Sequence, residues 1–175
     1  ARAINITGLS ESADAFKALP ATIRKQLVAV VNEVAANTRS DIVNRIAADG
    51  FNTASVRARI RLDKATANND VATISLDLKK IPFSRVKFAS QRTDGTGTRA
   101  SVWVLRGGKR VQVYGFINPY GKKRRPMIRY AKAGKPRLVM AGGVGLRGWW
   151  NDIITEQFLD ELQANLASTF SRRVT

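Results

Sequence analysis

Cysteine and histidine are both absent from the 175-residue sequence. Their absence excludes thiol nucleophiles, Ser-His triads, zinc fingers and imidazole acid-base chemistry, because the side chains that perform them are missing. A chain of this length buries about two-thirds of the surface that it exposes when unfolded, so it can fold without disulfides or metals. Most common enzyme mechanisms are thereby excluded, and we expect no catalytic residue, no cofactor and no metal.

Long apolar runs are also missing. No segment approaches the roughly 18 consecutive apolar residues that a membrane-spanning helix needs. Residues 1–4 lack the basic-then-apolar order of a signal peptide. We expect a soluble protein with no membrane partner.

Acidic residues are scarce in the middle third of the chain. Residues 79–137 contain 17 basic residues and one acidic residue, Asp94, whereas residues 1–78 and 138–175 are nearly neutral. This density of positive charge repels itself unless it is well solvated or lies against a polyanion or an acidic protein. A solvated surface is the simpler interpretation, but so large an excess favours an anionic partner.

Two segments have the apolar spacing of helices that bury one face. In the first, residues 20–48, Pro20 suits the first turn and Gly50 suits the position after the end. The second, residues 149–171, has Asp152 and Glu156 near its start, and acidic residues are favourable at a helix N-terminus. The apolar faces of both helices fit either a core or an interface between copies of the chain.

The region between the two helices, about residues 71–140, is rich in strand patterns. Residues 71–78 alternate apolar and polar side chains, as in a strand with one buried face. Gly107 and Gly108 separate two β-rich runs and predict a hairpin. Further strands are expected at 127–130 and 138–140.

Residues 53–62 allow two interpretations. Thr53 or Ser55 could cap a short basic helix that leads into an extended segment, but apolar and arginine residues also alternate here as in a strand. We favour the short helix. Together the patterns predict an α+β fold over residues 1–175 as a single domain, in which an antiparallel β-sheet or meander is packed by a long N-terminal helix and a C-terminal helix.

Basic residues gather at the predicted turns and strands of the middle region. They can hold nucleic-acid phosphates or an acidic protein surface, and no base-reading motif accompanies them. The alternative is a set of basic hairpin tips in water. The residues expected to contact DNA in a channel, or an acidic partner, are Lys109, Arg110, Lys122, Lys123, Arg124, Arg125 and Arg129.

A glycine-rich segment, residues 142–148, precedes the second helix. It is similar to a phosphate-binding loop but lacks the Gly-Lys-Ser/Thr ending, so we interpret it as a hinge. Trp149 and Trp150 follow it. We expect them to anchor the core or a subunit interface rather than to stack on bases, and we assign them as interface anchors.

Asp77 and Lys79 could form half of a metal-dependent nuclease site, with the carboxylate holding Mg²⁺. Such a site needs further carboxylates around the metal. Glu33, Asp63 and Asp70 have no spacing that brings them to Asp77. The sequence therefore gives this alternative little support.

Several short segments follow one another in a characteristic order along the chain. They are VVNEVA at 30–35, RARIRL at 57–62, KA at 64–65, ISL at 74–76, IP at 81–82, FI at 116–117, MIR at 127–129 and KPRL at 135–138. Their order and spacing resemble the minor tail protein Z, or tail completion, family of lambda-like long-tailed bacteriophages. The loop at 94–98 and the segment 142–148 depart from that family's pattern.

The resemblance implies a structural role without catalysis. It implies a virion protein of the tail and neck, made in the host cytoplasm, that joins the tail tube to the connector at the head-proximal end. The implied partners are copies of itself in a ring, sixfold as in tail tubes of this type, together with the tail tube, the tail terminator or other neck proteins, and the end of the packaged double-stranded DNA. An architectural nucleic-acid-binding protein without sequence specificity is the alternative from a different class.

Overall fold

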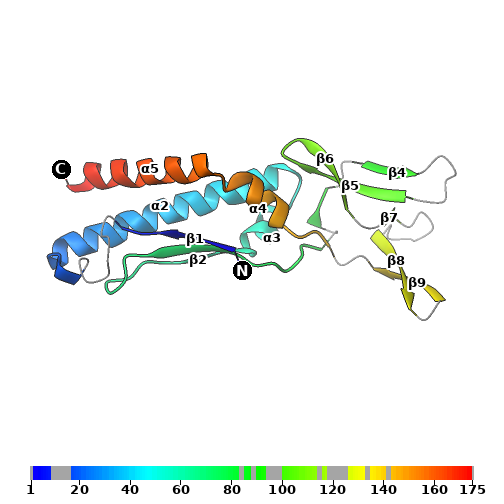
Figure 1. Ribbon diagram of the computed structural model, residues 1–175, viewed down its shortest axis with the longest axis horizontal. Helices are drawn as coiled ribbons and strands as arrows, with labels where there is room; N and C mark the ends of the chain where they lie inside the picture. The colour runs from blue at the N-terminus through cyan, green and yellow to red at the C-terminus, as the bar shows by residue number, and fades with distance from the viewer. Residues whose placement is uncertain are drawn as a thin grey trace.

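The computed structural model describes residues 2–8, 17–82, 85–87, 90–93, 100–113, 116–117, 126–132, 135–140 and 143–174. In this part of the chain, two helical layers and a small sheet form a three-layer body, and further β-strands extend from one end of it (Figure 1). The predicted α+β class, with a long N-terminal helix, antiparallel strands and a C-terminal helix, is confirmed. That residues 1–175 form a single domain stays a prediction.

The sheet of the body has β3 (Ala72–Leu76) at its centre, with β1 (Arg2–Ile6) and β2 (Ile60–Asp63) antiparallel on either side. Side chains alternate between the two faces of a strand, so one face buries Ile4, Ile74 and their neighbours while the other carries polar residues. β3 matches the predicted strand. β1 was not predicted, and it completes the sheet.

Helix α2 (Ala21–Ala48) lies between this sheet and the C-terminal helix, which places it in the middle layer (Figure 1). It begins after Pro20 and ends at Asp49, and Gly50 follows with φ of 99°, the left-handed conformation that glycine adopts freely. Because α2 has a neighbour on two sides, its buried residues are spread around it. They are Leu27, Val30, Val31, Val34, Ala35, Thr38, Ile42, Val43 and Ile46.

Two polar side chains of α2 bind the backbone at the start of β2 and beyond its end. Arg39 donates from Nε to the carbonyl of Ile60 at 2.8 Å and from its terminal nitrogen to the carbonyl of Arg57 at 3.1 Å. Seven residues earlier on the same helix, the Asn32 amide donates to the Ala65 carbonyl at 3.0 Å and accepts the Ala65 N–H at 2.8 Å. These bonds fix both ends of the β2 segment to α2.

A short helix, α3 (Thr53–Arg57), leads into β2, as favoured from the sequence. The cap expected at Thr53 or Ser55 was wrong, because Asn52 is the residue before the first turn. The Asn52 side chain accepts the Ser55 N–H at 3.1 Å and so caps the helix, because a side-chain oxygen at the residue before the first turn reaches that donor.

The strands beyond the body form two three-stranded antiparallel sheets. One contains β4 (Ser90–Thr93), β5 (Ala100–Arg106) and β6 (Lys109–Val113); the other contains β7 (Phe116–Ile117), β8 (Pro126–Lys132) and β9 (Lys135–Met140). The predicted hairpin at Gly107 and Gly108 is confirmed, and both glycines have positive φ values, 55° and 76°. The predicted loop at 94–98 lies outside the described residues.

The C-terminal helical segment is divided into α4 (Arg147–Ile153) and α5 (Glu156–Val174). One continuous helix over 149–171 was expected. The chain leaves helical geometry at Ile154, and the Thr155 hydroxyl oxygen then accepts the Phe158 N–H at 3.2 Å, which caps the start of α5. The break lets α4 and α5 pack against α2 in different directions.

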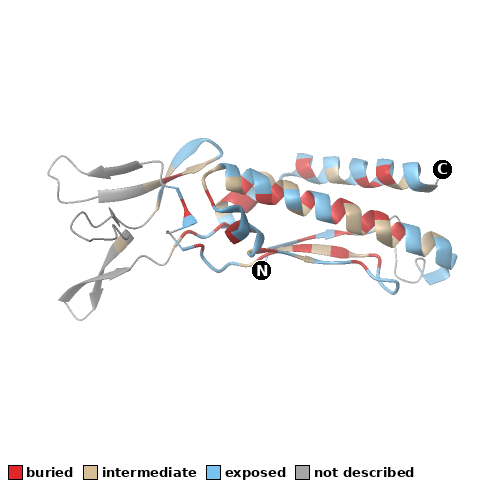
Figure 2. Cartoon of the chain, turned by 180° about the vertical axis from the view of Figure 1, so that it is seen from behind, coloured by how far each residue is buried: buried red, intermediate tan, exposed pale blue. Residues whose placement is uncertain are grey.

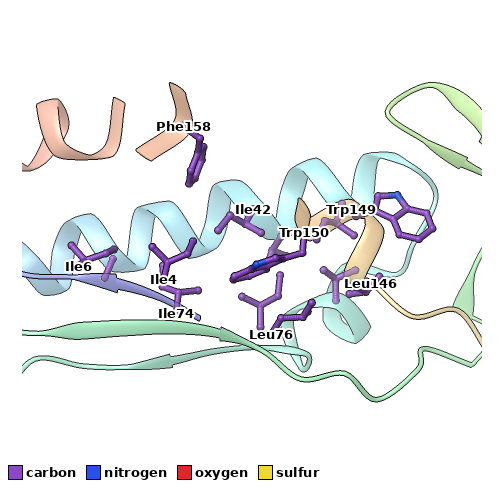
Figure 3. Close-up of a cluster of buried hydrophobic side chains, with 14 of the residues drawn as sticks. Ile4, Ile6, Ile42, Ile74, Leu76, Leu146, Trp149, Trp150 and Phe158 are labelled. Carbon is purple, nitrogen blue, oxygen red and sulfur yellow. The ribbon is translucent and has the colours of Figure 1, made fainter. Parts of the chain in front are cut away.

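The hydrophobic core runs along both sides of α2 (Figure 2). At one end of it, Trp150 lies over Leu76 of the sheet, with Leu146 nearby (Figure 3). Phe158 of α5 covers the opposite side of α2. None of the helices in the described part of the chain is both long and apolar enough to cross a membrane.

Candidate interaction surfaces

Asp49, just after α2, ties together three segments that are distant in the sequence. Its Oδ2 atom accepts two hydrogen bonds, from the indole Nε1 of Trp149 and from the backbone N–H of Gly107, each at 2.8 Å. Hydrogen bonds to an ionised acceptor are stronger than those between neutral groups. Asp49 therefore fixes the β5–β6 turn and α4 to the end of α2.

Arg106, the last residue of β5, strengthens the same joint. Its Nε atom lies 2.9 Å from Oδ2 of Asp152, and its guanidinium lies 5.9 Å from the centroid of the Trp149 ring. A Cβ atom on Gly148 would come too close to this guanidinium, so a side chain there would require the end of Arg106 to move. Phe51 packs edge-to-face on Trp149 with ring centroids 5.0 Å apart.

Lys109 and Arg110, two of the predicted contact residues, are exposed at the start of β6, directly after the turn that Asp49 holds. On β5 of the same hairpin, opposite Val111, Val104 is fully buried in the core and anchors the hairpin to the body. The two cations therefore extend from a fixed hairpin into solvent, where they are able to meet a phosphate or a carboxylate.

For the other basic residues predicted to contact DNA or an acidic partner, the structure does not describe the side chains. Lys122, Lys123, Arg124 and Arg125 lie outside the described residues. Arg129 lies on β8 opposite Leu138 of β9, and its side chain is outside the described part as well. Their contacts stay predictions.

Trp149 and Trp150 are both buried within the chain, in the core rather than on the surface. Trp149 belongs to the joint with Asp49, and Trp150 packs between α4, α2 and the sheet (Figure 3). Core packing is thus one of their two expected roles. Their assignment to a subunit interface stays a prediction.

The segment interpreted as a hinge is held in place over its described residues, 143–148. Val144 and Ile81 exchange two backbone hydrogen bonds of 2.8 Å, and Leu146 is buried. Gly143 adopts φ of 115°, and a Cβ atom there would collide with the carbonyl of Ile81. This part of the segment fixes α4 to the chain after β3.

A second group of basic residues surrounds Asp77, at the end of β3, and was not singled out from the sequence. Its Oδ2 atom lies 3.5 Å from Arg59 and 3.6 Å from Arg61, and its Oδ1 accepts the backbone N–H of Lys79 at 2.9 Å. The Lys79 N–H and the nearby cations hold the pKa of Asp77 below its usual value of 3.8. The alternating arginines at 57–61 were the available signal, hidden because residues 1–78 are nearly neutral as a whole.

The carboxylates proposed for a nuclease site are dispersed. Asp77 is engaged with arginines, Asp63 lies opposite Thr73 at the far end of β2, and Glu33 pairs with Arg173. Across the described ranges no three Asp or Glu residues converge as a metal site would require. The geometry gives the nuclease alternative no support.

The chain matches the model of the prophage minor tail protein Z family over residues 6–171. No curated protein and no solved structure that was compared gave a match. The family match includes the long helix, the sheet strands β2 and β3, the basic hairpins and nearly all of α5. The chain belongs to the prophage minor tail protein Z family, whose members are structural proteins of the phage tail.

Proposed function

We propose that this tail protein completes the head-proximal end of the tail and joins the tail tube to the connector. In this role it forms a ring of identical copies, sixfold as the family resemblance implies, beside the tail terminator or other neck proteins. The proposal is supported by the family match over residues 6–171 and by the concentration of 17 basic residues in residues 79–137. A ring repeats each basic hairpin around its axis.

The observation that carries the proposal is the position of the basic hairpin. Lys109 and Arg110 are exposed on a hairpin whose base is fixed to the body through Asp49 and Arg106. Cations held in fixed positions around a channel favour a polyanion without reading its sequence. We infer that these residues, with 122–125 and Arg129, face the end of the packaged DNA or an acidic neighbouring ring.

A cryo-electron reconstruction of intact particles tests the position. We expect ring-shaped density for this protein between head and tail, with the basic hairpins toward the channel or a neighbouring ring. Particles that contain the protein elsewhere in the tail would reject the neck position but leave the family's tail role intact.

Charge reversal at residues 122–125 tests the basic contacts. Glu at all four positions should block joining of heads and tails, or the positioning of the DNA end, while circular dichroism of the purified protein stays unchanged. A matched control reverses four exposed basic residues that lie outside the basic segment and in no ion pair of the described residues, Lys25, Arg57, Lys64 and Arg172. Normal particle yield from the 122–125 variant would contradict the proposal.

The alternative function, an architectural protein that binds nucleic acid without sequence specificity, is favoured by the same charge. The two functions differ in their response to salt. Binding to phosphates weakens steeply as the salt concentration rises, because the release of counterions from the nucleic acid becomes less favourable, and the slope is roughly proportional to the number of phosphates contacted. A ring subunit also holds its neighbours through apolar contacts, so its assembly should persist at salt concentrations that abolish DNA binding.

A further inference from the structure

Two leucines are exposed on the body, and the charges around them have opposite signs. Leu78, after β3, is 54% exposed, and Leu159, on α5, is 36% exposed. No other large apolar side chain is as exposed among the residues whose exposure the structure describes. Apolar side chains that remain exposed within a charged surface are typical of sites where proteins bind one another.

Leu78 lies in a basic patch, which we define as Arg61, Leu78, Lys79 and Lys80. Arg61, Leu78 and Lys79 line one shallow depression at the end of β3. Lys79 and Lys80 are exposed and have no ion-pair partner among the described residues. Asp77 offsets part of the charge of Arg61, and the patch as a whole remains positive.

Leu159 lies on an acidic face, which we define as Glu156, Leu159 and Asp160. Glu156 and Asp160 are one helical turn apart, both are exposed, and neither has an ion-pair partner in the described part of the chain. Residues 148–171 contain four acidic residues and no basic one, in a chain whose net charge is +17. The acidic face is therefore unlike the rest of the molecule.

The two surfaces lie on opposite sides of the body. The sheet and α5 flank α2 on its two sides (Figure 1). Arg61 is on the outer face of the sheet, because Ile60 and Leu62 on either side of it pack toward the core. The acidic face likewise points away from α2, since the buried residues of α5 are Phe158, Leu166 and Thr169.

The two surfaces also lie at a similar level along the body. Arg2 pairs with Leu76 at the end of β3, and its guanidinium donates to the Asn151 side chain of α4. The end of β3, which bears the basic patch, is therefore close to the start of the C-terminal helices. Two copies placed side by side can bring the patch of one to the acidic face of the next without sliding along the long axis.

We propose that the basic patch of one copy binds the acidic face of the next copy, with Leu78 and Leu159 packed together at the centre of the contact. This inference rests on the proposed ring and names the surfaces that build it. The two surfaces are different, so the contact is head-to-tail and leaves both surfaces available for further copies, as a ring requires. Charge complementarity selects the second copy as the occupant, since both partners are present on the same chain.

Cysteine crosslinking tests the contact directly, because the natural sequence has no cysteine. Leu78→Cys and Leu159→Cys proteins, purified separately and carrying tags of different size, should form a mixed disulfide dimer after oxidation. A chain with both substitutions should form a ladder of dimers, trimers and larger species. The matched control pairs Leu78→Cys with Ser168→Cys, which is exposed on α5 more than two turns from Leu159 and should give no mixed dimer.

Charge exchange provides a second test. Glu at Lys79 and Lys80, or Lys at Glu156 and Asp160, should each weaken self-association by at least about tenfold, because like charges then face each other. Both changes in one chain, or an equal mixture of the two variants, should restore association. Glu at Lys25 and Lys64, two exposed lysines outside both surfaces and outside the basic hairpin, reverses the same amount of charge and should leave association unchanged.

Failure of this inference is distinguishable from failure of the proposed function. Crosslinking is also carried out on assembled particles, where tail position is read separately by cryo-electron microscopy. Neck-located protein without the mixed crosslink would overturn the inference alone. Loss of salt-sensitive DNA binding in the Lys79 and Lys80 variant, with self-association intact, would also overturn it and would assign the basic patch to DNA.

Discussion

At the scale of single residues, two carboxylates of this protein lie where segments meet. Asp49 joins the end of α2 to the β5–β6 turn and to α4, and Asp77 joins the end of β3 to Arg59 and Arg61 of the neighbouring segment. Each accepts a backbone N–H as well as a side-chain donor. Acidic residues are few in this chain, and these two are used to hold backbone in place.

Replacement of Asp49 tests the joint. Asp49→Ala leaves the Trp149 indole and the Gly107 N–H without their acceptor, so the free energy of unfolding should fall by about 1–3 kcal/mol. Urea denaturation measures this loss, and the indole N–H resonance of Trp149 should shift. Asp41→Ala is the control: its pair with Arg45 is exposed, and its removal should cost less than about 1 kcal/mol. Equal losses in the two variants would contradict the assignment.

The lowered pKa of Asp77 predicts a pH dependence of defined sign. Because the folded-state pKa is below 3.8, the ionised carboxylate stabilises the fold at pH values above 3.8, and this contribution is lost as pH falls through the folded-state pKa. The difference in free energy of unfolding between the natural protein and Asp77→Asn should be constant near neutral pH and shrink below pH 3.8. A difference that grows on acidification would refute this account.

At the scale of elements, the joint between β3 and α4 depends on a single backbone conformation. Gly143 has a positive φ and passes so close to the Ile81 carbonyl that no side chain fits. Gly145, two residues later, has no atom within 4 Å of its Cβ direction. Glycine is therefore required at position 143, whereas the space around position 145 would accept a side chain.

Gly143→Ala should lower the free energy of unfolding by about 2 kcal/mol or more, because both strain and a backbone collision oppose it. Gly145→Ala should change it by less than about 1 kcal/mol. Thermal denaturation of the two variants, followed by circular dichroism, compares them. The prediction fails if Gly145→Ala is the more destabilising change.

Elements with long or repeated patterns could be predicted from the sequence. α2 has seven turns of apolar spacing bounded by Pro20 and Gly50, and the β5–β6 hairpin has two glycines between alternating runs. β1 has only Ile4 and Ile6 as its pattern and becomes a strand through pairing with β3, a contact between distant residues. The break at Ile154 was missed because apolar spacing continues across it, while the Thr155 cap depends on local geometry.

The candidate surfaces could likewise be predicted from the sequence only in part. Net charge along the chain pointed to the hairpin, where Lys109 and Arg110 are indeed exposed. The basic patch and the acidic face could not be recognised, because each combines an exposed leucine with charges whose exposure only the fold determines. Asp49 likewise gave no signal, since its donors come from residues 58 and 100 positions away.

At the scale of the whole molecule, a net charge of +17 acts against compactness. Few ion pairs among the described residues offset this repulsion between positive charges, and most of these pairs are exposed. The Debye length is about 10 Å at 0.1 M salt, so added salt screens repulsion between distant cations more than it weakens contacts within the joints.

The midpoint of thermal unfolding should therefore rise by a few degrees between about 20 mM and 300 mM sodium chloride. Replacing Lys122, Lys123, Arg124 and Arg125 by Gln lowers the net charge by four and should reduce this rise. Calorimetry of both proteins gives the comparison. A midpoint that falls as salt is added would show that ion pairs, rather than self-repulsion, dominate.

The hydrogen bond from Trp149 to Asp49 also sets an order of events during synthesis. The ribosome delivers Asp49 and the β5–β6 turn well before Trp149, which lies 100 residues after Asp49. A nascent chain can form the hydrogen bond between Gly107 and Asp49 before Trp149 is made, but the bond from the Trp149 indole has to wait until α4 leaves the exit tunnel. Completion of the joint is therefore a late step of synthesis, and the β5–β6 turn shares Asp49 with Trp149 only once α4 has been made.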